Sequence, residues 1–353
     1  MRKIDIMDRV VVGEGTPCLV MVDAGVNHNN VPERAFKLIK TAAKGGADII
    51  KFQTYKADTI TTKTAPRYWN PRLDTDGGGT QYETFNRLDK LPIETYPEMI
   101  ELCKKEGVIF SSTPFDLDSA KFLDELGMEV FKISSSDITY HQLLKSVAET
   151  GKPVILSTGT ASIAEIKEAI EVINNAKNDD IILQHCILSY PCKAEDSNLK
   201  KMTKLMEIFP DIPIGYSDHT EGIAVPLAAV AWGAKTIEKH YTIDKKLPDS
   251  PDHSFSLDPD ELKDMIRSIR KVESSLGTFV DGYYPSEEKA YQYARKSVVA
   301  ATDIPKDTVI KEQMLTCKRP GTGIYPKYLK SLVGRKAKVH IKEDNTINWE
   351  MIR

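Results

Sequence analysis

Two histidines end two neighbouring apolar segments at matching positions. His219 ends residues 214–219, and His240 ends residues 236–240. Both segments have the pattern of a short buried strand, and the small, mostly apolar residues 222–234 between them predict a helix. Two imidazoles directed from adjacent parallel strands are what a divalent-metal site needs. The simpler alternative is two unrelated histidines, one packed and one exposed. Three further polar residues share these strand ends: Ser217, Asp218 and Glu238.

Two lysines lie inside apolar segments, where a lysine is rarely found. Lys51 follows Ile49 and Ile50, and Lys132 follows Val130 and Phe131. A buried ammonium group is costly unless it is paired, so each lysine requires an anion. A phosphate held by lysines and hydroxyl groups meets this requirement. The alternative is an ion pair with Asp or Glu that closes one end of the fold.

The elements that must position these residues repeat as strand–helix units of roughly 25 to 35 residues, the length of a parallel crossover. Eight units of this kind favour a closed (β/α)8 TIM barrel in the α/β class, with an open doubly wound sheet as the alternative. The predicted strands are residues 19–22, 48–54, 108–113, 130–135, 154–158, 181–186, 212–216 and 236–240. The predicted helices include residues 34–44, 96–106, 119–125, 143–149 and 164–174. A hairpin-like lead-in with a turn at Gly13–Gly15 precedes them.

In a barrel of this kind, the side chains at the carboxyl ends of the strands face one site. The candidates in chain order are Asp23, Asn27, His28, Lys51, Gln53, Ser112, Thr113, Lys132, Ser134, Ser135, Asp137, Ser157, Thr158, His185, Tyr190, Ser217, Asp218, His219, Glu238 and His240. Lysines, hydroxyl groups, histidines and carboxylates therefore converge. For Ser112 and Thr158, the alternative is that they only satisfy backbone groups or shape a turn.

The pattern predicts a barrel domain over residues 1–280, a linker over 281–294 and a small, mostly β domain over 295–353. Short β-like pieces of the small domain are residues 298–301, 308–310 and 337–340. Residues 56–92 interrupt the barrel pattern after its second strand. Because they form a loop at the carboxyl end of a strand, we predict that they are a lid or part of the substrate pocket.

Composition excludes several classes of function. The 48 basic and 51 acidic residues leave a net charge of −3, which indicates neither nucleic acid nor an anionic membrane as a partner. No apolar run approaches the length of a membrane span, and the acidic Asp5 lies where a signal peptide needs apolar residues. The five cysteines form no CxxC pair. We therefore expect a cytoplasmic protein with reduced thiols.

Several motifs, in this order, resemble the sialic acid synthase (N-acetylneuraminate synthase) family. They are Val22-Asp-Ala-Gly-Val-Asn-His28, Ile50-Lys-Phe-Gln-Thr54, Phe110-Ser-Ser-Thr-Pro-Phe115, Phe131-Lys-Ile-Ser-Ser-Ser-Asp137, Leu156-Ser-Thr-Gly159, Ile214-Gly-Tyr-Ser-Asp-His-Thr220 and Ile237-Glu-Lys-His240. Near the end of the chain, Ala294-Arg-Lys-Ser-Val-Val-Ala300 and Cys317-Lys-Arg-Pro-Gly321 resemble the antifreeze-like SAF domain that follows the barrel in these enzymes. The resemblance covers nearly the whole chain.

The resemblance implies a transferase that condenses phosphoenolpyruvate with an N-acetylated hexosamine, of the N-acetylmannosamine type, to give a nine-carbon sialic acid and phosphate. A legionaminate or pseudaminate synthase acting on a 2,4-diacetamido-6-deoxyhexose is the alternative. The implied cofactor is a divalent metal, Mn²⁺ or Mg²⁺, which polarises the sugar aldehyde. Less favoured alternatives are a Schiff-base aldolase that uses Lys51 or Lys132 as an amine, and a glycan-binding protein without catalysis.

The resemblance also assigns roles to residues. His219 and His240 match metal ligands. Lys51, Lys132, Ser134, Ser157 and Ser217 match positions around phosphoenolpyruvate, with Thr113 nearby, and Asp23 and Glu238 are the candidate catalytic carboxylates. Gln53, Tyr190 and Asp252 match sugar contacts. Arg319 matches an arginine that reaches the N-acetyl group from the partner subunit, which implies a domain-swapped homodimer.

Two residues depart from the pattern of the family. Asp23 replaces the usual Glu, so its carboxylate reaches less far, although it can still act through a water. Leu188 replaces an Asn, which removes one contact to phosphate or carboxylate and indicates a different hexose.

Overall fold

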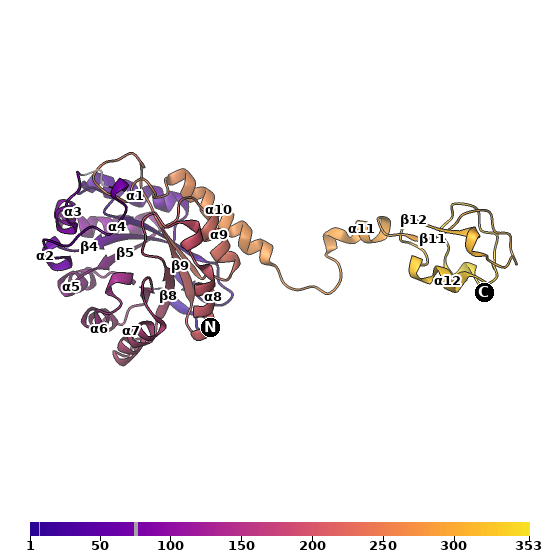
Figure 1. The fold of residues 1–353 in the computed structure, drawn as a ribbon, viewed down its shortest axis with the longest axis horizontal. Helices are drawn as coiled ribbons and strands as arrows, with labels where there is room; N and C mark the ends of the chain where they lie inside the picture. The colour runs from indigo at the N-terminus through magenta and orange to yellow at the C-terminus, as the bar shows by residue number, and fades with distance from the viewer. Residues whose placement is uncertain (7, 74–76) are drawn as a thin grey trace. The chain divides into compact units, whose positions relative to one another are not determined.

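The computed structural model describes residues 1–6, 8–73 and 77–353, and it divides into two compact units, Met1–Gly277 and Thr278–Arg353. In the first unit, eight parallel strands close into a barrel in the order β10-β3-β4-β5-β6-β7-β8-β9 (Figure 1). The strands are β3 (Leu19–Gly25), β4 (Ile49–Thr54), β5 (Ile109–Pro114), β6 (Phe131–Ile133), β7 (Val154–Ser157), β8 (Ile181–Cys186), β9 (Ile214–Asp218) and β10 (Thr236–His240). The predicted (β/α)8 barrel is confirmed.

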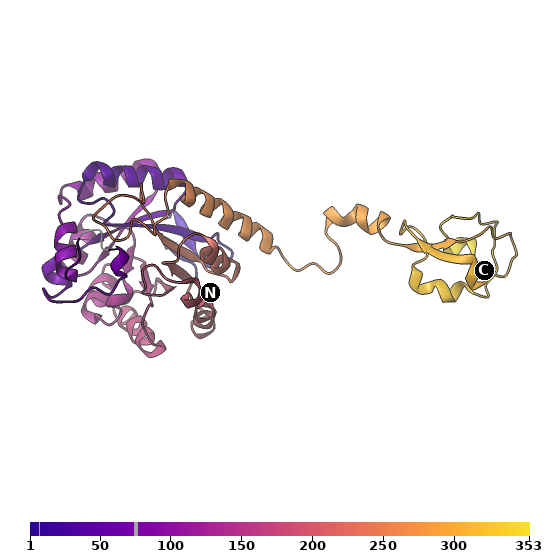
Figure 2. The same ribbon diagram turned by 45° about the horizontal axis from the view of Figure 1, so that its top comes forward.

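Helices surround the barrel, as Figure 1 shows. They are α1 (Pro32–Gly45), α2 (Ala57–Ile60), α3 (Gln81–Leu88), α4 (Thr95–Glu106), α5 (Leu117–Glu125), α6 (His141–Ala148), α7 (Ile163–Asn175), α8 (Leu199–Ile208), α9 (Ala224–Ala231) and α10 (Pro259–Leu276). Figure 2 shows α1 and α10 lying side by side. The starts of α7 and α10 follow from local chemistry, because Ser162 and Asp258 form capping boxes with the glutamates at the third helical position.

Side chains alternate between the inside and the outside of the barrel along each strand, and the inward ones fill its interior. The inward residues of the amino-terminal strand halves are apolar and form one buried cluster: Leu19, Met21, Ile49, Ile109, Val130, Ile155 and Ile182. The hairpin of β1 (Ile4–Ile6) and β2 (Val10–Val12) packs Ile4, Ile6 and Val12 against this cluster. One end of the barrel is therefore closed by apolar packing, and polar inward residues are left for the other end. The expected hairpin is present, but Gly13–Gly15 follows β2 and does not form its turn.

The long connection after β4 has structure of its own. It contains α2, a short 3-10 helix at Pro71–Leu73 and α3, which begins with a capping box between Thr80 and Glu83. Residues 74–76 of this connection lie outside the described part of the chain.

The second unit has its own small core. It contains α11 (Glu288–Tyr293), the antiparallel strands β11 (Ser297–Ala300) and β12 (Leu315–Lys318), and α12 (Leu329–Leu332). The expected β-pieces near residues 309 and 337 occur as isolated bridges, and the sequence pattern missed strand β12. No helix in the described part of the chain is long and apolar enough to cross a bilayer.

Candidate active site

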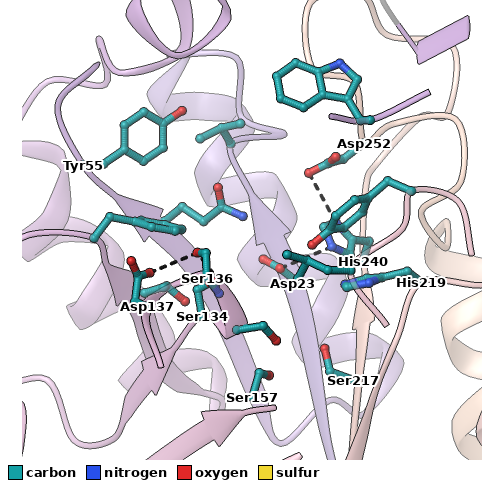
Figure 3. A pocket seen from close by; sticks show the side chains of 18 of the residues that line it. Asp23, Tyr55, Ser134, Ser136, Asp137, Ser157, Ser217, His219, His240 and Asp252 are labelled. Atoms are coloured by element: carbon teal, nitrogen blue, oxygen red, sulfur yellow. Dashed lines mark hydrogen bonds and ion pairs between the residues drawn. The ribbon is translucent and has the colours of Figure 1, made fainter. Parts of the chain in front are cut away.

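A cavity of about 540 Å³ opens where the barrel strands end (Figure 3). Strand ends and loops from around the barrel contribute to its wall. The predicted site residues that line it are Asp23, Lys51, Gln53, Thr113, Lys132, Ser134, Ser157, Tyr190, Ser217, His219, Glu238, His240 and Asp252. Ser135 and Asp137, also expected at the strand ends, line it too. Arg319 belongs to the other compact unit.

Six residues expected at this site point elsewhere. Because side chains alternate along a strand, Ser112, Thr158, His185 and Asp218 face the outside of the barrel. Ser112 Oγ lies 2.7 Å from Thr54 Oγ1, and Thr158 donates to the carbonyl of Gln184. Ser112 and Thr158 therefore have a structural role, which was the alternative prediction for these two residues.

The other displaced residues have structural partners as well. His185 Nε2 lies 2.8 Å from the carbonyl oxygen of Ser197, and Asp218 pairs with Lys239. Asn27 lies beyond an irregularity in β3, between Asp23 and Gly25, and its amide donates to the carbonyl of Tyr241. The sixth, His28, is fully buried beside Phe52. The expectation that Asp218 shares the polar site was therefore wrong.

The floor of the cavity is a network of buried charges. Lys51 Nζ lies 2.7 Å from Asp23 Oδ2 and 3.5 Å from Glu238 Oε1, while Lys132 Nζ lies 3.5 Å from Glu238 Oε2 and donates to Ser157. Burial lowers the pKa of Lys51, but Asp23 and Glu238 more than offset this effect, so the net pKa is raised. Burial dominates for Lys132, whose pKa is lowered. Both lysines are thus ion-paired, as the alternative prediction had it.

The two histidines lie opposite each other in register, because Glu238 pairs with Ser217 and Lys239 with Asp218. Their ring centroids are 5.2 Å apart. His219 Nδ1 donates to the carbonyl of Ile187 at 2.8 Å, which leaves Nε2 with a lone pair. Burial and the neighbouring His240 lower the pKa of His219 to about 3, so the ring is neutral, as a metal ligand must be.

His240 lies between two carboxylates. Its Nε2 is 3.6 Å from Asp23 Oδ2, and its Nδ1 is 3.3 Å from Asp252 Oδ2 (Figure 3). Burial lowers the pKa of His240, but Asp252 and Asp23 reverse this, and the net pKa is raised. In residues 1–6, 8–73 and 77–353, no three His, Cys, Asp or Glu side chains form a complete metal shell. Two imidazoles beside carboxylates nevertheless suit a divalent ion that keeps open positions for substrate, and such an ion would take the place of the proton on His240.

The upper wall of the cavity comes in part from residues 56–92, which were predicted to be a lid or part of the substrate pocket, but its individual side chains were not predicted. Its apolar members are Val26, Ile60, Trp69, Phe85, Leu88 and Phe115, and Tyr55 lies among them. One signal was present for Tyr55, because Lys51, Gln53 and Tyr55 continue a single alternation. Cys186 also lines the cavity, and burial raises the pKa of its thiol to about 11.

The fold and this site define a class of protein: a TIM-barrel enzyme with an ionic site at the carboxyl ends of its strands. Comparison with known proteins gives the family. Residues 38–281 match the NeuB family and residues 295–353 match the SAF domain. The chain belongs to the NeuB family, and it is a transferase of the sialic acid synthase type.

Individual relatives span nearly the whole chain. It is 41% identical to the N,N'-diacetyllegionaminic acid synthase of Campylobacter jejuni, over 93% of this chain and 98% of that one. It is 34% identical to human N-acetylneuraminate-9-phosphate synthase, over 97% and 94% of the two chains. The solved N-acetylneuraminic acid synthetase of Leptospira borgpetersenii, in complex with citrate, is 33% identical with a TM-score of 0.71, over 82% of this chain and 94% of that one.

Proposed function

We propose that this enzyme condenses phosphoenolpyruvate with the open-chain aldehyde of an N-acetylated hexosamine, forming a nine-carbon 2-keto sugar acid and releasing phosphate. One observation carries the proposal. Buried lysines and hydroxyl groups lie in the same cavity as paired histidines and carboxylates. The first set suits a phosphorylated carboxylic acid, and the second suits an aldehyde and a water. The names of the relatives agree with this chemistry.

The balance of charge supports a divalent metal, Mn²⁺ or Mg²⁺. The ammonium groups of Lys51 and Lys132 are outnumbered by the carboxylates of Asp23, Glu238 and Asp252. A phosphorylated carboxylate added to this site brings further negative charge, which is costly in a buried cavity. His219 and His240 would hold the metal, which as a Lewis acid polarises the aldehyde.

The protein's own groups account for the other steps. Lys51, Lys132, Ser134, Ser157 and Ser217 hold the phosphate and carboxylate, so that C3 of the enol faces the aldehyde carbon. As the new carbon–carbon bond forms, C2 becomes electron-poor and the aldehyde oxygen takes up a proton. Water adds to C2, a carboxylate accepts its proton, and phosphate leaves as the ketone forms. Asp23 is well placed to be this base, because Lys51 fixes its Oδ2 and the amide of Gly25 fixes its Oδ1.

Two sugars remain candidates, N-acetylmannosamine and a 2,4-diacetamido-6-deoxyhexose. Above the ionic floor, the acidic residues of the described cavity wall are Asp137 and Asp252. The lysines that line the described cavity, Lys51 and Lys132, lie in the floor. This arrangement favours an uncharged sugar over a sugar phosphate. The apolar upper wall and Leu188 favour the deoxy sugar, whose methyl group needs no hydrogen bond.

Phosphate release from phosphoenolpyruvate tests the proposal. The purified chain is assayed with Mn²⁺ and each sugar in parallel, with metal-free and sugar-free controls. Release that requires both sugar and metal supports the synthase, and the preferred sugar identifies the product. No release with either sugar contradicts it.

The rival amine chemistry has one observation in its favour, because a lowered pKa of Lys132 is what an amine nucleophile needs. Borohydride reduction in the presence of pyruvate separates the two mechanisms. Stable labelling of Lys132 would establish the Schiff-base route, and the synthase predicts none.

We also propose a cytoplasmic homodimer in which Arg319 of the partner subunit reaches the sugar. Mixing tests this assembly. Subunits carrying His219→Ala and subunits carrying Arg319→Ala are each inactive, but after joint refolding mixed dimers have one intact site. Random pairing restores about a quarter of wild-type activity. Activity that stays at the level of the separate variants contradicts the shared site.

A further inference from the structure

Tyr55 has a buried hydroxyl group with no hydrogen-bond partner among the described residues. The residue is 6% exposed, and it lines the cavity across from Asp252 and His240 (Figure 3). A buried polar group without a partner costs free energy, and in a native protein it often marks a place where a ligand binds. Burial raises the pKa of Tyr55 well above its usual value, so the group is a neutral donor.

The position of Tyr55, directly after the end of β4, relates it to one end of the substrate. Lys51, Gln53 and Tyr55 face the cavity in turn, and a strand rises about 3.3 Å per residue. Tyr55 therefore lies about 13 Å along the chain from Lys51, which is at the ionic floor. A sugar whose aldehyde carbon meets phosphoenolpyruvate at the floor directs its remote carbons toward Tyr55.

The surroundings of Tyr55 define the chemistry of the group that fits. Its ring is held by edge contacts with Phe85 and Phe115, at centroid distances of 5.4 and 5.8 Å. Ile60 and Leu88 line the same part of the cavity. Tyr55 therefore presents a hydroxyl donor next to apolar side chains. An acetamido group matches it, because its carbonyl accepts one hydrogen bond and its methyl group buries apolar surface.

We propose that Tyr55 determines sugar specificity by donating to the carbonyl of an acylamino group on the remote half of the sugar. This inference rests on the proposed function, and it selects the 2,4-diacetamido-6-deoxyhexose over N-acetylmannosamine. A site built to donate to a substrate group discriminates against the analogue that lacks it.

The variant Tyr55→Phe removes the hydroxyl and keeps the ring. We expect kcat/KM for the diacetamido sugar to fall about tenfold, which corresponds to one hydrogen bond. With N-acetylmannosamine the change stays within about twofold, because that sugar has no second acylamino group. The melting temperature is unchanged or raised, since the hydroxyl has no partner in the free enzyme.

Tyr96→Phe is the matched control. Tyr96 is also a buried tyrosine, but its hydroxyl lies 3.2 Å from Thr54 Oγ1 and it does not line the large cavity. The control leaves the ratio of kcat/KM values for the two sugars unchanged.

Three results overturn the inference. Two concern this residue alone: equal losses with both sugars in Tyr55→Phe, or a wild-type enzyme that uses only N-acetylmannosamine. Both leave the proposed function standing. If the wild type releases phosphate with neither sugar, the proposed function fails and this inference fails with it.

Discussion

Strands β9 and β10 carry buried polar residues on both faces, and the two faces differ in how well these groups are satisfied. Outside the barrel, Lys239 Nζ lies 2.5 Å from Asp218 Oδ2 and also donates to the carbonyl of Thr220. Inside, Glu238 Oε2 and His240 Nδ1 have looser ion-pair contacts, at 3.5 Å to Lys132 and 3.3 Å to Asp252, and neither atom has a hydrogen bond among the described residues. The charges on the outer face hold the strands together. Those on the inner face keep hydrogen-bonding capacity that a ligand can use.

The difference shows that a buried charge at a strand end is not by itself evidence of catalysis. Asp218 and His219 are adjacent in sequence, yet the side chain of Asp218 is structural and that of His219 lines the cavity. If this division is correct, substitutions inside should cost activity and substitutions outside should cost stability.

The largest effect is expected for His219→Ala. Losing one of two proposed metal ligands should lower kcat/KM by about a thousandfold or more, since the Lewis acid supplies several kcal/mol of transition-state stabilisation. The free energy of unfolding should change by about 1 to 2 kcal/mol, because the variant loses one hydrogen bond to Ile187 and the contact of its ring with Tyr190. Phosphate release and urea denaturation measure the two quantities.

His141→Ala is the control for this substitution, because His141 is exposed at the start of α6. It should retain full activity. A His219→Ala enzyme that keeps wild-type kcat/KM, or that loses activity only because it is unfolded, would contradict the assignment of the inner face.

The outer face should give the opposite result. Lys239→Met leaves Asp218 as a buried carboxylate without its partner, and we expect a loss of about 3 to 5 kcal/mol in the free energy of unfolding. The fraction that remains folded should keep kcat/KM within a few-fold of wild type. The double variant Asp218→Leu/Lys239→Met should recover most of the stability, because an apolar pair leaves no buried charge unpaired.

A single variant with unchanged stability would show that the ion pair contributes little. If the Lys239→Met enzyme is folded but inactive, the Asp218–Lys239 pair instead has a role in positioning His219.

Much of the fold followed from the sequence, because burial imposes a period of two on the strands and a period near 3.6 on the helices. All eight barrel strands were predicted, and β8 and β10 have the expected bounds. The site was predicted less completely. Strand ends were identified correctly, but not which side chains face inward, so Asp218 and His185 were grouped with residues that line the cavity.

Residues 56–92 were predicted to line the pocket, but the individual side chains of the upper wall were not, for a different reason. Tyr55, Trp69 and Phe85 come together from a long connection whose path depends on tertiary packing, and aromatic residues in a loop have no local pattern that indicates a binding surface. The small domain posed the same problem, because most of its pairing consists of isolated bridges without strand periodicity.

The smallest effect is expected at Asp137, a charged residue of the inner wall that lies off the ionic floor. Burial raises its pKa from 3.8 to about 6. Because the folded protein binds this proton more tightly than the unfolded chain, the group destabilises the fold above about pH 6, and the penalty disappears as the pH falls toward 4. Asp137→Asn removes the penalty. It should raise the free energy of unfolding by about 1 kcal/mol at pH 7.5 and by less at pH 5.

Urea denaturation at the two pH values checks this difference, with Asp281→Asn at an exposed position as the control. Because Asp137 also lines the cavity, we expect the same variant to bind the sugar less well. If Asp137→Asn has the same free energy of unfolding as the wild type at both pH values and binds the sugar normally, Asp137 behaves like the charges of the outer face. Lining the cavity would then not distinguish functional charges from structural ones.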